Sequence, residues 1–195
     1  MQSADERPDD DSAAVDHAGH RIELVPLEAL FDLRKTVLRP WLTPEGAMAA
    51  YADGAERFHV GARAGPAPDA RVVSTASFKI ELPHGPGSAA LLAEAGAATG
   101  DATGDATGSY WRLLSMATYP EAQGSGLGGA VLGFGVAELA RRLAERGAGS
   151  AVVWCQGRTG ARRFYERQGF AAVGEEFENP GTGPHFVFWR TVAAA

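Results

Sequence analysis

The stretch 110–155 constrains the fold of this chain more than any other part of the sequence. Its first nine residues have the apolar content of a strand, and four glycines then lie within 124–129. An amphipathic helix is expected over Gly126–Arg146. The continuous apolar run Ala151–Cys155 predicts a strand that is covered on both faces. Strand, helix and strand in this order predict a βαβ unit with a right-handed crossover.

Simpler patterns flank this unit on both sides. Before it, the sequence predicts a strand, a helix and two strands that a Pro/Gly turn joins as an antiparallel pair, at Arg21–Pro26, Leu27–Leu38, 57–63 and Arg71–Ile80. After it, a helix and two further antiparallel strands are expected at Thr159–Gln168, Phe170–Glu178 and Phe186–Val192. The whole pattern predicts an α/β fold with a mixed sheet.

Two segments lack the periodicity of packed elements. Residues 1–19 are polar and acidic, which predicts a disordered tail ahead of a single domain over 20–195. Residues 82–109 include a tandem Ala-Thr-Gly-Asp repeat. Its small residues are not expected to bury a face, so 82–109 is predicted to be a flexible insertion between two strands.

Composition excludes several classes of function. The chain has 195 residues, a formal net charge of −6 and a pI near 5.4, so it lacks the basic surface that nucleic-acid binding needs. A single cysteine, Cys155, allows neither an intramolecular disulfide nor a cysteine metal cluster, and no metal is expected. The acidic start is unlike a secretory signal, and no apolar run approaches the ~18 residues of a membrane span. These features predict a cytoplasmic protein that does not bind membranes.

The glycine-rich segment is suited to binding an anion. Backbone N–H groups at a helix start lack intrahelical partners, and glycines leave them accessible. Gly124, Gly126 and Gly129 match the letters of a dinucleotide fingerprint, but the acid expected about 20 residues later is missing. A nucleotide P-loop would need Lys-Ser/Thr after the glycines, where Gly129-Ala130 stands. A purely structural alternative is a turn that allows close packing of helix and strand.

A third match is more informative. Gln123-x-x-Gly126-x-Gly128 resembles the Arg/Gln-x-x-Gly-x-Gly/Ala acyl-CoA signature of the GNAT superfamily of N-acyltransferases. The preceding Met116–Pro120 looks like the strand and turn before that loop, and Ala161–Phe170 looks like the second motif of the family. The resemblance covers about 21–192. It implies a GNAT-like fold: a mixed, mostly antiparallel twisted sheet with a central βαβ unit and flanking helices, in the order β, α, α, β, β, β, α, β, α, β, β.

The resemblance also implies a reaction. An N-acetyltransferase of this type moves the acetyl group of acetyl-CoA directly to the amine of a small molecule or a peptide, without a covalent enzyme intermediate. A non-catalytic CoA-binding or sensing module on the same fold is the alternative, and a homodimer is compatible with either. Gln156 (or Arg158) stands where many members carry Asn. The residues implied to bind acetyl-CoA are Met116, Ala117, Thr118, Gln123, Gly124, Ser125, Gly126, Leu127, Gly128, Gly129, Gln156, Arg158, Ala161 and Phe164.

Candidate catalytic groups follow from the same match. Tyr165 corresponds to the tyrosine that often protonates the departing CoA thiolate, and a phenol with a pKa near 10 can do so at neutral pH. Its alternative role is packing against the sheet. The sequence does not assign the base that deprotonates the amine; His185 is a candidate base or substrate contact.

Other polar residues are weaker candidates. Arg34 and Arg39 would suit a substrate carboxylate, or are ordinary surface arginines at a helix end. Glu176 is a further candidate for the substrate side. His59 is expected to be a solvated strand residue, and Cys155 a buried strand residue without nucleophilic function.

Overall fold

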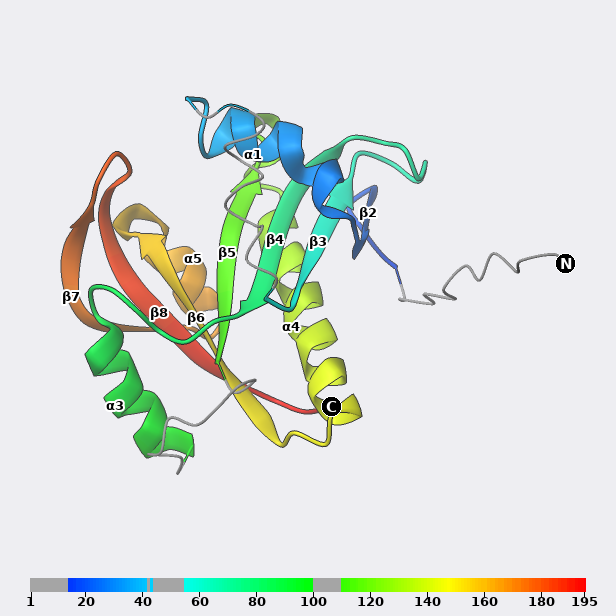
Figure 1. The fold of residues 1–195 in the computed structure, drawn as a ribbon. Coiled ribbons are helices and arrows are strands. Elements are labelled where there is room, and N and C mark those ends of the chain that lie inside the picture. The colour runs from blue at the N-terminus through cyan, green and yellow to red at the C-terminus, as the bar shows by residue number, and fades with distance from the viewer. Residues whose placement is uncertain (1–13, 42, 44–54, 100–109) are drawn as a thin grey trace, which may run out of the picture.

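The structure is a computed structural model, which describes residues 14–41, 43, 55–99 and 110–195. Its strands form one eight-stranded sheet in the order β1-β2-β3-β4-β5-β6-β8-β7 (Figure 1). Every neighbouring pair is antiparallel except β5 and β6, which are parallel. The strands are β1 (Val15–His17), β2 (His20–Leu24), β3 (Arg57–Arg63), β4 (Val72–Ile80), β5 (Tyr110–Thr118), β6 (Ser150–Arg158), β7 (Ala171–Asn179) and β8 (Gly183–Ala193).

Helices cover both faces of this sheet. They are α1 (Phe31–Val37), α3 (Ser88–Thr99), α4 (Leu127–Glu145) and α5 (Arg162–Arg167), with short 3₁₀ turns at Leu27–Leu30, Pro120–Ala122 and Thr159–Ala161. Successive strand residues point to opposite faces, which separates the helices into two layers. On β4, Ser77 contacts Arg34 of α1, whereas Phe78 lies against Gly135 of α4. On β6, Trp154 packs in a cluster with Leu91 of α3, whereas Cys155 contacts Tyr165 of α5.

The predicted βαβ unit is confirmed as β5, α4 and β6, with β5 and β6 parallel. The antiparallel pairs predicted on either side are confirmed as β3–β4 and β7–β8. The second helix of the implied order would fall within 44–54, outside the described residues. No helix in the described ranges combines the length and the apolar character needed to cross a membrane.

The prediction of a disordered tail over 1–19 is wrong at its C-terminal end. Val15–His17 pairs with β2 as an edge strand, while residues 1–13 lie outside the described part of the chain. Ala18 and Gly19 both have positive φ, 49° and 79°. Positive φ at both central residues is what a two-residue hairpin turn of type I′ requires, so this short turn sets the pairing of β1 with β2.

The prediction that 82–109 is a flexible insertion is wrong over 88–99. Alanine-rich sequences have high helix propensity, and Ser88–Thr99 forms α3. Leu91 and Ala95, one helical turn apart, are fully buried in a second apolar cluster with Tyr110, Trp154 and Val187. Residues 100–109, which carry most of the repeat, lie outside the described residues. The segment therefore contributes to the core at the β6–β8 end of the sheet.

Two glycines of α4 offer a matched test of this packing. A Cβ on Gly135 would lie 2.2 Å from the Phe78 ring, whereas one on Gly133 would meet nothing within 4 Å. Gly135→Ala should therefore lower the free energy of unfolding by about 1–2 kcal/mol, because overpacking exceeds the gain in helix propensity. Gly133→Ala should raise it by about 0.5–1 kcal/mol. Urea denaturation measures both, and equal shifts of the two variants would contradict the packing described.

Candidate functional site

The site is built where β5 and β6 separate. Within the described residues, the two strands pair over three positions, from Tyr110↔Val152 to Arg112↔Trp154. Beyond Arg112, β5 continues to Thr118 with β4 on its other edge, and β6 continues to Arg158 with β8 on its other edge. Each strand thus has one edge that faces the gap. Backbone N–H and C=O groups along both edges are available to whatever enters it.

A β-bulge shapes the β5 side of the gap. The register with β4 shifts between Thr75↔Ala117 and Ser77↔Leu114, which places one extra residue in β5. Ser115 within this bulge has a φ of 56°, an uncommon conformation for a residue other than glycine. A bulge bends its strand and interrupts the ladder, so it changes the direction of the β5 edge beside Met116.

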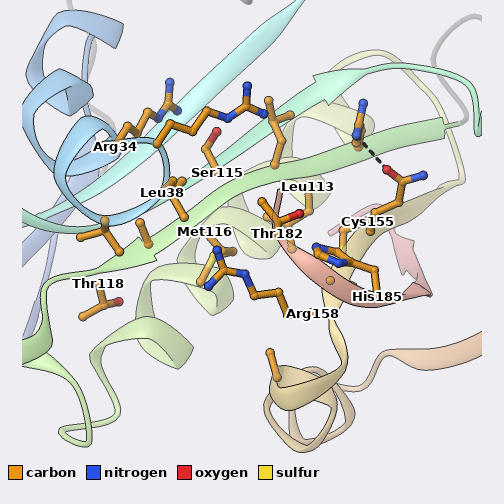
Figure 2. A pocket seen from close by; sticks show the side chains of 18 of the residues that line it. Arg34, Leu38, Leu113, Ser115, Met116, Thr118, Cys155, Arg158, Thr182 and His185 are labelled. Atoms are coloured by element: carbon orange, nitrogen blue, oxygen red, sulfur yellow. Dashed lines mark hydrogen bonds between the residues drawn. The ribbon is translucent and has the colours of Figure 1, made fainter. Parts of the chain in front are cut away.

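A cavity of about 780 Å³ occupies the gap (Figure 2). Consecutive residues of both strands line it, Arg112–Thr118 from β5 and Cys155–Arg158 from β6, so the edges of the strands form its walls. Residues of α1 close one side, and Asn179, Thr182 and His185 of the β7–β8 region close the other. Figure 2 shows the Arg158 side chain extending from β6 toward β5.

The glycine loop lies at the end of β5. Gly124 and Gly126 have positive φ, 78° and 82°, and Gly126 is the N-cap of α4. Side chains brace the loop, since Gln123 donates to the Thr118 carbonyl at 2.9 Å and Ser125 to the Ala122 carbonyl at 2.8 Å. The first backbone hydrogen bond of the helix is donated by the Ala130 N–H to the Gly126 carbonyl. The N–H groups before Ala130 therefore make no i→i−4 bond within the helix.

The other two glycines of the loop lie near side chains of the α5 region. A Cβ on Gly129 would lie 2.9 Å from the Gln168 side chain, and one on Gly128 would lie 3.8 Å from the Phe164 ring. The Gln168 side chain is flexible and could shift to admit a Cβ on Gly129, and the Gly128 distance is an ordinary contact. The turn itself depends on Gly124 and Gly126.

Tyr165 lies in the cavity wall and is nearly buried. Its ring stacks on Phe188 at 4.7 Å and meets Phe170 edge-on at 5.8 Å, so it also has the packing role considered from the sequence. Its hydroxyl lies near the Cys155 thiol. Burial, and then Cys155, raise the pKa of Tyr165 well above 10, so the phenol keeps its proton at neutral pH. It is therefore available as a proton donor.

Cys155 is buried, as predicted. Burial raises the pKa of its thiol to about 12, against which the Tyr165 hydroxyl and the Arg112 charge act. A thiol with this pKa is protonated at neutral pH and is a poor nucleophile. Cys155 therefore contributes a wall to the cavity rather than a reactive group.

His185 faces the cavity from β8. Its side chain is nearly buried, and its Nδ1 lies 2.7 Å from the Gly183 carbonyl oxygen. A carbonyl can only accept, so Nδ1 carries the hydrogen and donates it to Gly183. In the neutral ring, Nε2 is then the unprotonated nitrogen. This tautomer leaves an acceptor for a proton on the ring.

Comparisons with known proteins agree with this geometry. The model of the FR47-like protein family matches residues 100–178, which include the glycine loop, Tyr165 and both edges of the gap. The chain is 27% identical over 171 residues, 88% of its own length and 95% of the relative, to the uncharacterized N-acetyltransferase YitI of Bacillus subtilis strain 168. Together these matches support a GNAT N-acetyltransferase domain in this chain. The predicted acyltransferase class is thereby confirmed.

Solved structures share the fold of this GNAT domain. A putative GNAT acetyltransferase from Desulfovibrio desulfuricans is 23% identical, with a TM-score of 0.51 over 89% of this chain and 98% of that one. An aminoglycoside 6'-N-acetyltransferase complexed with coenzyme A is 12% identical, with a TM-score of 0.55 over 89% of this chain and 98% of that one. The predicted GNAT-like sheet with its central βαβ unit and flanking helices is confirmed.

The cavity of the GNAT domain brings together many of the residues singled out from the sequence. They come from α1, both edges of the gap, the 3₁₀ turn before α5, α5 itself and β8, namely Arg34, Arg39, Met116, Ala117, Thr118, Gln123, Gln156, Arg158, Ala161, Tyr165 and His185. Gly124, Ser125, Gly126, Leu127, Gly128, Gly129 and Phe164 are not among its lining residues and lie around its loop end and α5. The sequence motifs thus converge on one region.

Two predicted site residues have other partners in the structure. Glu176 does not line the cavity; the Thr159 hydroxyl donates to it at 2.7 Å on the exposed surface. The structure therefore gives no support for Glu176 as a substrate contact. The Gln156 amide lies in the cavity wall but is engaged with Arg112 and with the His84 carbonyl, each at 3.4 Å. The Gln156 side chain therefore lines the cavity and also forms hydrogen bonds at the base of the gap.

The expectation that His59 is solvated is wrong. The side chain is 8% exposed, and its Nδ1 lies 2.7 Å from the Ser77 hydroxyl. Burial, followed by the charges of Arg34 and Arg57, lowers the pKa of His59 to about 4, so the ring is neutral at neutral pH. Ser77 comes from the neighbouring strand, so this contact was not visible in the pattern around His59.

Sequence reasoning also missed a charged cluster at the base of the gap. Glu81 accepts from Lys79 at 2.8 Å and from Arg112 at 2.9 Å, and the hydrogen bonds of these two cations, despite burial, hold its pKa below the usual range. Arg112 also lies 5.0 Å from the centroid of Trp154. Lys79 and Glu81 stand at the end of one predicted strand and Arg112 in the next, and these opposite charges were the signal available in the sequence. These groups close the gap where β5 and β6 diverge.

Proposed function

We propose that the chain transfers the acetyl group of acetyl-CoA directly to the amine of a small molecule or a peptide. One observation carries the proposal: the gap between β5 and β6 has two open strand edges, begins beside the glycine loop and has the Tyr165 phenol in its wall. An extended chain with amide groups fits between two such edges as an additional strand. The pantetheine arm of CoA has this chemistry.

The residues present fit the whole cosubstrate. The braced glycine loop would offer amides of a helix start to a pyrophosphate. Gly124 and Gly126 place no side chain of their own over these amides, and the His17 ring lies near Gly126. The β5 edge around Met116 offers backbone N–H groups to a carbonyl oxygen, where they would stabilise negative charge. When bound, acetyl-CoA supplies an acyl thioester, which an amine can attack. The protein's task is to orient that thioester, exclude water and move protons.

Two side chains are placed to move protons. His185 Nε2 would accept the proton of the attacking amine, which is mostly ammonium at neutral pH and must lose a proton to react. Tyr165 would give its proton to the departing thiolate, because its raised pKa keeps the phenol protonated. His185 and Tyr165 approach the same cavity from β8 and α5.

The acceptor would enter between α1 and the β7–β8 region. Among the described lining residues six are Lys or Arg and one, Glu81, is acidic, although the whole chain carries a net charge of −6. We infer that the acceptor carries an anionic group such as a carboxylate, with Arg34 and Arg39 of the α1 side as its contacts. Apolar residues of the same side, Leu27, Phe31 and Leu38, would contact its remaining part.

The direct test measures thiol release from acetyl-CoA with a panel of amines. The panel pairs amino acids with their amides and adds polyamines, aminoglycosides and short peptides, and mass spectrometry identifies the acetylated product. Release that depends on an amine, with a matching product, is the expected result. Tight CoA binding without release for any acceptor would instead favour the non-catalytic CoA-binding alternative.

His185→Gln should lower kcat/KM about 100-fold at neutral pH, because the amine loses its proton acceptor. Raising the pH supplies more of the free amine, so the deficit against the wild-type protein should shrink as the pH rises. Steady-state rates across a pH series measure it. A deficit that stays constant with pH would assign His185 to binding rather than to proton transfer.

A further inference from the structure

Three buried polar residues form a chain behind the acceptor end of the cavity. Arg34 of α1 is 7% exposed, lines the main cavity and donates through Nη2 to the Ser77 hydroxyl. Ser77 of β4 stands directly opposite His59 of β3, and its oxygen lies 2.7 Å from His59 Nδ1. Ser77 and His59 do not line the main cavity; they lie behind it, near Arg57 and Lys79. Within the described part of the chain, His59 reaches the site through Ser77 and Arg34.

The donors and acceptors of these three side chains determine the direction of each hydrogen bond. Arg34 is a donor only, so Ser77 Oγ accepts, and the hydroxyl hydrogen of Ser77 can be donated onward. His59 is neutral at neutral pH, and its Nδ1 can accept that hydrogen. Hydroxyl and imidazole are neutral groups, so these contacts orient the guanidinium without neutralising its charge. An acid in place of His59 would orient Arg34 too, but its charge would oppose the binding of an anion.

Packing alone does not explain why Arg34, Ser77 and His59 are buried together. Burying three polar side chains between α1 and the sheet costs free energy unless they are hydrogen bonded, and apolar residues of similar volume would pack there at lower cost. A fixed orientation of Arg34 is what the polar arrangement adds. Arginine otherwise has many rotamers, and ordering them on binding weakens affinity.

We propose that His59 is a positioning residue for the acceptor: through Ser77 it holds the Arg34 guanidinium at the acceptor end of the cavity. The inference rests on the proposed function, in which Arg34 contacts an anionic group of the acceptor. It adds that selectivity for an anionic acceptor depends on a histidine that the acceptor does not touch. The acetyl-CoA end of the gap, formed by the glycine loop and the β5 edge, has no part in this chain.

Two substitutions of His59 separate positioning from simple core packing. Asn places a side-chain amide close to the position of Nδ1 and can keep the Ser77 bond, whereas Leu removes it. With the best-acetylated amino acid of the panel as acceptor, His59→Leu should raise its KM about tenfold, the effect of losing one hydrogen bond in a charged network. The KM of acetyl-CoA and that of the matching amide should stay within about twofold. His59→Asn should restore the acceptor KM to within about threefold of the wild-type value.

A double-mutant cycle tests the path through Ser77. Ser77→Ala should raise the acceptor KM as much as His59→Leu does. The double variant should have the same acceptor KM as either single variant, because both substitutions break the same series of hydrogen bonds. His20→Leu, in the β1–β2 hairpin and outside the cavity lining, is the matched control and should leave all constants unchanged. Equal rises of KM for the amino acid and its amide, a parallel rise for acetyl-CoA, full additivity, or failure of His59→Asn to restore binding would each overturn the proposal.

A readout independent of turnover keeps the two proposals distinguishable. In ¹⁵N spectra, a held guanidinium gives an Arg34 Nε–H signal that is protected from exchange with water, and Arg34→Lys assigns it. This protection should persist in His59→Asn and be lost in His59→Leu. If no amine is acetylated, the proposed function fails, and this spectrum alone decides whether His59 orders Arg34. An unchanged Arg34 signal in His59→Leu would then refute the positioning role.

Discussion

Gly126→Asp should weaken CoA binding at least 100-fold while Gly126→Asn weakens it far less. Gly126 is the N-cap of α4 with a φ of 82°, and Asn and Asp are the side chains that tolerate this left-handed conformation best. The two variants have nearly the same size, so they share any strain and differ in charge. A carboxylate at this point occupies the helix start that would receive the pyrophosphate and repels it. Isothermal titration calorimetry with CoA measures the effect, about 2.7 kcal/mol for 100-fold.

Folding can be monitored separately in these variants. Asp is a favourable N-cap residue, so Gly126→Asp should retain a melting temperature close to that of Gly126→Asn. Gly133→Asp adds the same charge to the same helix at an exposed position and should leave CoA affinity within about twofold. Equal CoA affinity in Gly126→Asp and Gly126→Asn would remove the glycine loop as the pyrophosphate site.

Tyr165→Phe should lower kcat about 100-fold while the affinity for CoA stays within about threefold. The ring remains stacked on Phe188, so packing is retained and only the hydroxyl is lost. The departing thiolate then lacks a proton donor, and general acid catalysis typically contributes 10²- to 10⁴-fold. Because the pKa of Tyr165 is raised, the wild-type rate should show no loss from phenol ionisation up to at least about pH 9.

Cys155→Ala is the control for the Tyr165 experiment. It removes the sulfur that the phenol contacts but keeps the phenol, so most of the rate should remain. A rate in Tyr165→Phe equal to that of the wild-type protein would leave Tyr165 with packing alone. A rate in Cys155→Ala as low as that of Tyr165→Phe would show that the contact between the two side chains, rather than proton donation, determines the rate.

Local patterns were sufficient for the central part of the fold. The apolar run before the glycines, the amphipathic helix and the buried strand are continuous in sequence, and the structure has them as β5, α4 and β6 within a few residues of the predicted bounds. The residues around the gap followed from motifs that lie on these same elements. Tyr165 and Cys155 were both expected to be buried to some degree, and both are.

Features that depend on distant partners could not be predicted in this way. The burial of His59 depends on Ser77, 18 residues away, which in turn contacts Arg34, 43 residues from it. α3 was missed because its alanine-rich sequence has a weak apolar stripe, and its two inward residues are buried by strands that come later in the chain. β1 was missed because three residues show no periodicity; its turn and the open edge of β2 determine it.

The three-residue pairing of β5 with β6 divides the sheet into two half-sheets of five and three strands. Near the cavity, the strands of each half-sheet stay paired apart from the bulge in β5 and the register shift between β7 and β8. Between the halves, strand pairing ends at Arg112 and Trp154. A ligand that pairs with both edges therefore completes the sheet and adds to its cooperativity. Ligand binding would therefore be measured as thermal stabilisation of the whole domain. Without the ligand, the two half-sheets would move relative to each other about the junction at Arg112.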